Sequence, residues 1–317
     1  MSLPTLYPET AARRSRLPVD GGHELQLHEW GNPLGQPALL LHGGPGSSCT
    51  PLLARVFDPA RYRVIGFDQR GAGLSTPAGS TAHNTTDDLL ADVRALRAHL
   101  GVPRSLVVGG SWGATLALLH AADCPEAVTA LLLRGVFVAR RADVDAFFAA
   151  APPGFDDGWR PWREQAGRDG LDFVELLDHV MNHGSSDEQT ALASAWWRFE
   201  QTMDGGSPAS PADPATLCAR YRVQAHYLRH GCWLDRRPLL ERLTGLPPVP
   251  TLLLHGELDH ICPWPGALAV QAAAPHAVLR RIDAAGHAPT HPALVAAMVR
   301  ALDHYAECGH FGMEPAA

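Results

Sequence analysis

Short apolar runs alternate with longer amphipathic segments along most of the chain. Runs rich in Leu, Val and Ile are typical of strands covered on both faces of a sheet. We expect β-strands at residues 24–30, 38–41, 63–67, 106–108, 130–133, 251–254 and 278–282. Alternation of such strands with helical segments predicts an α/β fold with a doubly wound, mostly parallel sheet.

The helical segments carry capping residues and apolar positions at helical spacing. Thr85 begins one helix, with Asp88 three residues later as its capping partner. Apolar residues then repeat every three or four positions, at Leu89, Val93, Leu96 and Leu100. A closing helix is expected at residues 292–307, with its apolar residues on one side.

The middle of the chain, residues 137–235, contains no convincing strand. Five of the eight tryptophans lie there, which predicts a helical insertion with its own apolar surface. Residues 204–208 break it internally, and Asp213-Pro214 predicts an N-cap and first turn. We expect an α/β core at residues 1–136 and 236–317, with residues 137–235 as a cap. Such a cap would cover the carboxyl ends of the strands, where open α/β sheets bind ligands.

Composition excludes several classes of partner. The net charge is −7 and no Lys/Arg-rich face stands out, so nucleic acid is not expected as a partner. The apolar runs are too short to span a membrane, and residues 1–20 show no secretory signal. The six cysteines are scattered, which indicates reduced thiols in a cytoplasmic protein. The sequence leaves the oligomeric state open between a monomer and a small homo-oligomer.

Ser111 lies in the segment Gly109-Gly110-Ser111-Trp112-Gly113, between a predicted strand and a predicted helix. A tight strand-to-helix turn lifts a serine hydroxyl clear of the sheet, and small flanking residues let the backbone pass closely. The pentapeptide alone can arise by chance in a glycine-rich chain. Its setting between a strand and a helix makes Ser111 our candidate nucleophile.

A serine nucleophile needs a base, and the base needs an orienting acid. His287 follows the last predicted strand, after Gly286, and Asp259 follows the strand at residues 251–254. Each of them alone could be an ordinary loop or turn residue. Together with Ser111 they stand at strand ends in the chain order serine, acid, histidine, which is that of α/β-hydrolases. We therefore expect these three residues to form a catalytic triad.

An oxyanion hole requires backbone N–H donors close to the nucleophile. We expect one from Trp112, directly after Ser111, and a second from Gly44 in the loop His42-Gly43-Gly44-Pro45-Gly46. A glycine-rich loop after a strand can also bind phosphate. This loop matches neither G-x-x-x-x-G-K nor G-x-G-x-x-G, so the phosphate interpretation is disfavoured.

Other clusters favour structural roles. The pairs His179/His183 and His226/His230 have a spacing that could hold zinc, but neither belongs to H-E-x-x-H. We expect solvated or packing histidines there and no metal site. The segment that begins at Asp68-Gln69-Arg70 follows a strand, and we expect Asp68 and Arg70 to hold neighbouring loops.

With these residues assembled, the chain resembles the proline iminopeptidase family of α/β-hydrolases. The resemblance covers nearly the whole chain and rests on segments that occur in the same order: His42-Gly43-Gly44-Pro45-Gly46, Asp68 to Ser75, Asn84-Thr85-Thr86, Gly109 to Gly113, Leu133 to Phe137 and Gly286-His287. It implies release of N-terminal proline from a small peptide or amino-acid derivative, with a serine triad and no cofactor.

The resemblance also implies a substrate pocket with acidic residues in the cap that bind the free amine. Glu200 matches the first of them, and Phe137 and Phe147 match apolar positions around the proline ring. A buried carboxylate can pair with a secondary ammonium and reject N-blocked chains. A glutamate on the surface of the cap is the alternative.

The chain departs from the family pattern at two positions in this pocket. The second amine-binding glutamate is replaced by Gln224, and a ring-contacting aromatic is replaced by Leu228. A neutral amide accepts a hydrogen bond but does not offset the charge of an ammonium, so we expect amine recognition weaker by roughly 1–3 kcal/mol. An esterase or amidase that acts on an amino-acid ester or amide is therefore the second function. A non-catalytic ligand-binding scaffold is the third candidate function. Dehalogenase and epoxide hydrolase chemistry on this fold use a carboxylate nucleophile, so Ser111 disfavours both.

Overall fold

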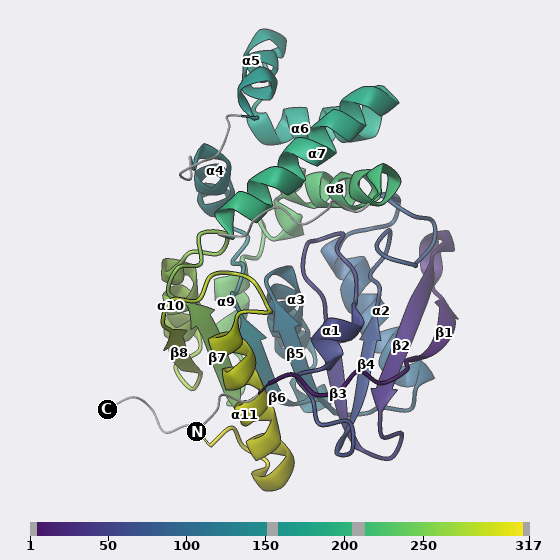
Figure 1. The fold of residues 1–317 in the computed structure, drawn as a ribbon, viewed down its shortest axis with the longest axis vertical. Helices are drawn as coiled ribbons and strands as arrows, with labels where there is room; N and C mark the ends of the chain where they lie inside the picture. The colour runs from purple at the N-terminus through teal and green to yellow at the C-terminus, as the bar shows by residue number, and fades with distance from the viewer. Residues whose placement is uncertain (1–4, 151–157, 205–212, 313–317) are drawn as a thin grey trace.

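The centre of the molecule is an eight-stranded sheet with the strand order β1-β2-β4-β3-β5-β6-β7-β8 (Figure 1). The computed structural model describes residues 5–150, 158–204 and 213–312. The strands are β1 (Arg13–Pro18), β2 (Glu24–Gly31), β3 (Gln36–Leu41), β4 (Tyr62–Phe67), β5 (Ser105–Gly110), β6 (Val128–Arg134), β7 (Thr251–Gly256) and β8 (Val278–Ile282). The β1–β2 and β2–β4 pairs are antiparallel and the other pairs are parallel.

Helices cover both faces of this sheet. Buried side chains of α2 (Thr86–His99), α3 (Trp112–Asp123), α9 (Leu239–Leu243) and α10 (Trp264–Ala273) belong to the core on one face. Those of α1 (Pro51–Ala54) and α11 (Pro292–Cys308) belong to the core on the other face. The described residues also form three short 3₁₀ helices: η1 (Asp20–Gly22), η2 (Pro125–Ala127) and η3 (Gly231–Trp233). The predicted α/β fold is confirmed.

Each predicted strand and helix start has a counterpart in the structure. The capping box of α2 is complete, because the Thr85 side chain accepts from Asp88 N–H and Asp88 accepts from Thr85 N–H. Strand β1 was not predicted. It is an edge strand with three arginines, and all but one of its residues are exposed. Charged, solvated edge strands resist further pairing, and they also lack the apolar pattern from which strands are predicted.

Between β6 and β7 the chain forms a group of helices that we call the helical insertion. It comprises α4 (Arg141–Ala149), α5 (Arg160–Asp169), α6 (Phe173–His183), α7 (Ser186–Met203) and α8 (Pro214–Arg229). These helices lie together above the sheet in Figure 1. As predicted, no strand occurs among the described residues of this stretch. Domain boundaries at 137 and 235 remain a prediction.

The helical insertion has an aromatic core of its own. Phe148, Trp159, Trp196 and Phe199 are buried there, and Phe148 makes edge-to-face contacts with both tryptophans. The predicted N-cap at Asp213 is confirmed, since its side chain accepts from Thr216 N–H. Helix α7 ends at Met203, with Asp204 as its C-cap, and residues 205–208 of the predicted break lie outside the described residues.

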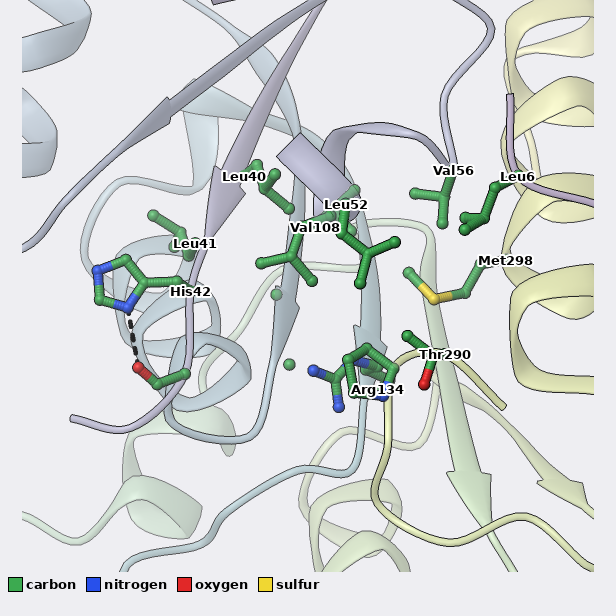
Figure 2. A pocket seen from close by; sticks show the side chains of 15 residues that line it. Leu6, Leu40, Leu41, His42, Leu52, Val56, Val108, Arg134, Thr290 and Met298 are labelled. Carbon is green, nitrogen blue, oxygen red and sulfur yellow. Dashed lines mark hydrogen bonds between the residues drawn. The ribbon is translucent and has the colours of Figure 1, made fainter. Parts of the chain in front are cut away.

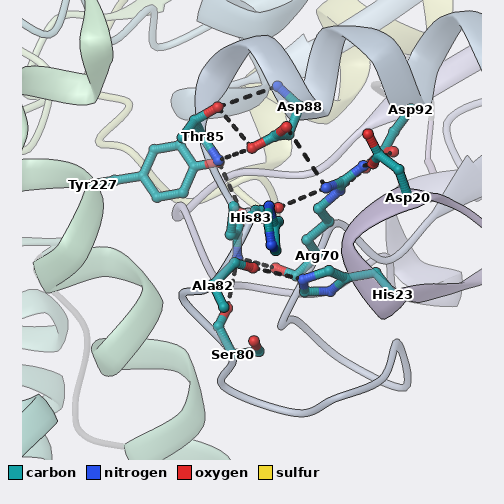
Figure 3. A network of polar contacts seen from close by, with 11 residues as sticks. Asp20, His23, Arg70, Ser80, Ala82, His83, Thr85, Asp88, Asp92 and Tyr227 are labelled. Carbon is teal, nitrogen blue, oxygen red and sulfur yellow. Dashed lines mark hydrogen bonds and ion pairs between the residues drawn. The ribbon is translucent and has the colours of Figure 1, made fainter.

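Arg70 and Asp68 hold the loops beside the sheet, as expected. The Arg70 guanidinium is fully buried and donates to Asp92, Asp20 and the carbonyl of His83 (Figure 3). Asp68 accepts from the N–H groups of Cys49 and Leu74. These contacts tie three loops and α2 together around one buried cation.

Within residues 5–150, 158–204 and 213–312, no helix combines the length and the apolar composition that crossing a bilayer requires.

Candidate active site

Ser111 stands at the sharp turn between β5 and α3. Its backbone angles are φ 56° and ψ −126°, a strained conformation for a residue with a side chain. The turn depends on two glycines. A Cβ on Gly109 would lie 2.3 Å from the carbonyl oxygen of Gly113, and a Cβ on Gly113 would lie 2.1 Å from that of Leu41. Only hydrogen atoms at these positions allow so close a passage of the backbone.

Asp259 and His287 meet in the loops that follow β7 and β8. The Nδ1 atom of His287 lies 2.7 Å from Oδ2 of Asp259, and Oδ1 of Asp259 accepts from Cys262 N–H at 2.7 Å. Burial opposes ionisation of Asp259. The imidazole of His287 and the N–H donor outweigh burial and keep the pKa of Asp259 below its usual value. The carboxylate therefore stays charged and fixes Nδ1 as the protonated nitrogen, which leaves Nε2 as a base.

A glycine after β6 makes room for this contact. A Cβ on Gly135 would lie 2.9 Å from Oδ2 of Asp259 and 3.0 Å from Nδ1 of His287, and Gly135 has φ +49°. A side chain here would push the acid and the histidine apart. No role for this glycine was predicted from the sequence, although it lies two residues after the strand predicted at residues 130–133.

A cavity of about 280 Å³ lies between the sheet and the helical insertion. Ser111 and His287 both line it, and so do six other residues predicted for the site: Gly44, Phe137, Phe147, Glu200, Gln224 and Leu228. Asp259 reaches the cavity only through His287. The Trp112 side chain is fully buried behind the turn. The structure thus gathers the predicted residues around one space of small-ligand size.

The loop expected to complete an oxyanion hole lies against Ser111. A Cβ on Gly43 would be 3.2 Å from Cβ of Ser111, and both Gly43 and Gly44 line the cavity. Trp112 is the first residue of α3, where helix N–H groups lack partners within the helix. Gly43 is an additional candidate, which the sequence did not single out from its neighbours.

Gln69 connects this loop to the nucleophile turn. Its side-chain oxygen accepts from the Trp112 indole N–H at 3.0 Å, and its amide donates to the His42 carbonyl at 2.8 Å. Gln69 N–H donates to Nε2 of His42, so the proton of this imidazole is on Nδ1, which donates to the Gly43 carbonyl. Burial lowers the pKa of His42 and keeps the ring neutral.

A second cavity, of about 30 Å³, lies beneath the nucleophile turn. Figure 2 shows Arg134 beside Thr290 at one end and the aliphatic side chains of Leu40, Leu52 and Val108 nearby. A space of this size admits a water molecule or two and no organic substrate. The Arg134 guanidinium donates to the carbonyl of His287 at 3.0 Å and so supports the histidine loop from below.

Two residues near the triad were missed at the level of sequence. Cys262 Sγ lies 3.9 Å from Ser111 Oγ, and burial raises the pKa of this thiol, so it stays protonated and is no rival nucleophile. Asp204 at the end of α7 accepts from Ala288 N–H at 2.7 Å and ties the helical insertion to the histidine loop. Burial raises the pKa of Asp204. Asp204 lies four residues after Glu200, a spacing that could have indicated a shared helix face.

Glu200 is enclosed by donors at the end of the cavity formed by α7 and α8. Its Oε2 accepts from Arg220 at 2.7 Å and from the Tyr221 hydroxyl at 3.0 Å, and its Oε1 accepts from Gln224 at 3.0 Å. The sequence predicted Glu200 and Gln224 at this place. Arg220, which was not predicted, lies four residues before Gln224 on α8.

The histidine pairs considered for zinc belong to no larger set of ligands in the described ranges, where one group of three potential ligands occurs: His304, Cys308 and His310. It lies at the end of α11, away from the cavity. Gly312 covers Nε2 of His304, because a Cβ on it would lie 2.6 Å from that atom. Nδ1 of His310 accepts from Gly312 N–H. The Nδ1 atoms of both imidazoles are engaged within this group, since Nδ1 of His304 also contacts the carbonyl of His310, and all six cysteines are free thiols.

Comparisons with known proteins agree with this architecture. The model of the alpha/beta hydrolase fold family matches residues 37–291. The chain is 37% identical to a proline iminopeptidase of Xanthomonas citri over 95% of this chain and 99% of that protein. It is 35% identical to a proline iminopeptidase of Arabidopsis thaliana over 93% of this chain and 80% of that protein. A crystal structure of a proline iminopeptidase-related protein from Thermus thermophilus has a TM-score of 0.57 and 26% identity, covering 95% of this chain and 96% of that one.

Proposed function

Because the chain belongs to the proline iminopeptidase family of α/β-hydrolases, we propose that it releases N-terminal proline, or a related small residue, from peptides. The observation that carries this proposal is one cavity that joins Ser111, the His287–Asp259 pair and Glu200. Ser111 and the His287–Asp259 pair supply the nucleophile, the base and the orienting acid that acyl transfer requires. Glu200 supplies an acceptor for the N–H groups of a substrate's first residue.

In the proposed reaction Ser111 Oγ attacks the first carbonyl carbon while Nε2 of His287 takes the hydroxyl proton. The oxyanion accepts hydrogen bonds from the N–H of Trp112 and from that of Gly44 in the glycine loop. His287 then gives the proton to the leaving amine as the C–N bond breaks. Water, deprotonated by the same nitrogen, attacks the acyl-enzyme and releases the amino acid. No step needs a cofactor.

The proposed acyl pocket lies under the helical insertion. Phe137, Phe147 and Leu228 offer apolar surface for a small ring, and Glu200 and Gln224 offer acceptors at its far side. We further propose that residues 137–235 act as a cap domain and that the protein works in the cytoplasm on small peptides. A peptide substrate longer than two residues would extend out of the cavity through its open side.

Turnover of L-prolyl-β-naphthylamide, compared with its N-acetylated form, tests this function. We expect turnover of the free imino acid derivative and at least about a hundredfold slower turnover of the blocked one, which lacks the ring N–H and is bulkier. Ser111→Ala should abolish both and should prevent labelling by a fluorophosphonate. Equal turnover of the two substrates would contradict amine recognition.

The pairing of Glu200 favours a second candidate function. Glu200 is already paired with Arg220, and its neighbour is the neutral Gln224. An esterase or amidase that acts on an amino-acid ester or amide would use the same triad. Its activity would depend less on binding the substrate's amine. Rapid cleavage of p-nitrophenyl esters without any cleavage of prolyl amides would favour that function.

A further inference from the structure

The end of the cavity between α7 and α8 is built from four residues that we call the amine end: Glu200, Arg220, Tyr221 and Gln224. Glu200 is the only carboxylate among them, and its side chain is 11% exposed. The Arg220 guanidinium binds it at 2.7 Å and also lies over the Tyr221 ring, 5.1 Å from its centroid. The side-chain amide of Gln224 donates a hydrogen bond to the same carboxylate. The side-chain oxygen of Gln224 is buried and has no partner among the described residues.

The charge at the amine end therefore sums to zero. One carboxylate is matched by one guanidinium, which donates to it in a charge-assisted hydrogen bond. An ammonium placed here would meet acceptors but no excess negative charge, so its desolvation would be compensated only by hydrogen bonds.

The other charged groups that face the cavity have different partners. Asp143 on α4 pairs with Arg140 at 2.8 Å, and Asp204 on α7 accepts from Ala288 N–H beside His287. Arg134 donates to the carbonyl of His287. Of these, Asp204 is the one carboxylate without a cationic side chain within ion-pair distance in the described structure, and it lies at the histidine loop, one helical turn from Glu200.

We propose that Arg220 is a specificity-determining residue, and that this pocket takes as its acyl group a small five-membered ring whether or not the ring carries a positive charge. The proposal rests on the proposed function and deepens it. A ring N–H would still donate to Oε1 of Glu200 or to the unpartnered oxygen of Gln224. Because Arg220 already balances the charge of Glu200, we expect that contact to be worth no more than an ordinary hydrogen bond, up to about tenfold in rate.

The test compares kcat/KM for L-prolyl-β-naphthylamide with that for cyclopentanecarboxylic acid β-naphthylamide, an isostere without the ring nitrogen. The ratio of the two values does not depend on the fraction of folded enzyme. We expect a ratio below about tenfold for the unaltered protein. In Arg220→Met the carboxylate is released, and we expect the ratio to rise by about 10- to 100-fold, as for a charge-assisted hydrogen bond.

Arg229→Met is the matched control, because Arg229 lies on the same helix and pairs with Glu175 outside the cavity. It should leave the ratio unchanged. If Arg220→Met does not fold, Gln224→Glu replaces it, since an added carboxylate also creates an unbalanced charge and should raise the ratio.

A ratio above about tenfold in the unaltered protein would overturn the proposal, as would an unchanged ratio in Arg220→Met. If the unaltered protein shows such a large ratio and Asp204→Asn removes it, Asp204 and not Glu200 binds the ammonium. Absence of any Ser111-dependent turnover of the prolyl substrate would contradict the proposed function itself, and the inference with it.

Discussion

Replacing Gln69 by leucine should damage both the stability of the protein and its chemistry. Leucine has nearly the volume of glutamine but neither its acceptor nor its donors. The buried indole N–H of Trp112 and the buried carbonyl of His42 would each lose their Gln69 side-chain partner. An unsatisfied buried polar group costs about 1–3 kcal/mol, so we expect a loss of roughly 2–5 kcal/mol in the free energy of unfolding.

The kinetic effect arises because Gln69 joins the nucleophile turn to the glycine loop. If that loop carries an oxyanion donor, a shift of about 1 Å would lower kcat by roughly a hundredfold with little change in KM. Gln69→Glu is the informative comparison. It keeps an acceptor for Trp112 but buries a carboxylate whose second oxygen faces the His42 carbonyl, so it should lose at least as much stability as the leucine variant and also lose kcat.

Denaturant unfolding and steady-state hydrolysis of a prolyl amide measure the two effects separately. Unfolding of Gln69→Leu within about 0.5 kcal/mol of the parent would refute the bridging role that we assign to this side chain. Normal kcat in both variants would show that the position of the glycine loop does not depend on it.

Three further predictions address the triad, a buried histidine and a buried ion pair. Asp259→Asn should lower kcat by about 10⁴, because an amide favours the wrong tautomer of His287, while thermal unfolding changes little. Burial lowers the pKa of His120 to about 4, so the unfolded chain binds the extra proton between about pH 6.5 and pH 4. Stability from this residue is complete above that window and should fall by about 3 kcal/mol across it, and His120→Leu should flatten a plot of unfolding free energy against pH. Arg70→Met leaves the buried Asp92 without its cation and should cost about 3–5 kcal/mol in chemical denaturation. A loss below about 1 kcal/mol would mean that the buried carboxylate of Asp92 does not depend on this cation.

The strands of the sheet interior could be predicted from sequence because burial on both faces imposes continuous apolar runs. Residues 106–108 and 252–254 have no other reason to be so uniformly aliphatic. Strand β1 has only one buried residue, and its pairing with β2 depends on backbone groups that the sequence does not reveal.

The residues of the predicted triad could be singled out from the sequence for a related reason. Turns at strand ends require glycines, and these glycines are visible in the sequence. Arg220 could not be singled out in this way. An arginine on a helix is most often a solvated side chain, and only the packing of α7 against α8 brings it to Glu200. Partners across a helix interface depend on rotation and register of both helices, which periodicity in either helix does not determine.

The sheet order explains why distant residues can act together. Strands β5, β6, β7 and β8 are neighbours and parallel, so their carboxyl ends form one edge. Each end is followed by one component of the site, namely Ser111, Gly135, Asp259 and His287 in that order. The glycine after β6 therefore belongs to the geometry of the proposed mechanism, because a side chain there would separate Asp259 from His287. Substitution of Gly135 by alanine should consequently reduce kcat more than any change of equal size on the cavity wall, and kcat measured beside Phe147→Leu checks this.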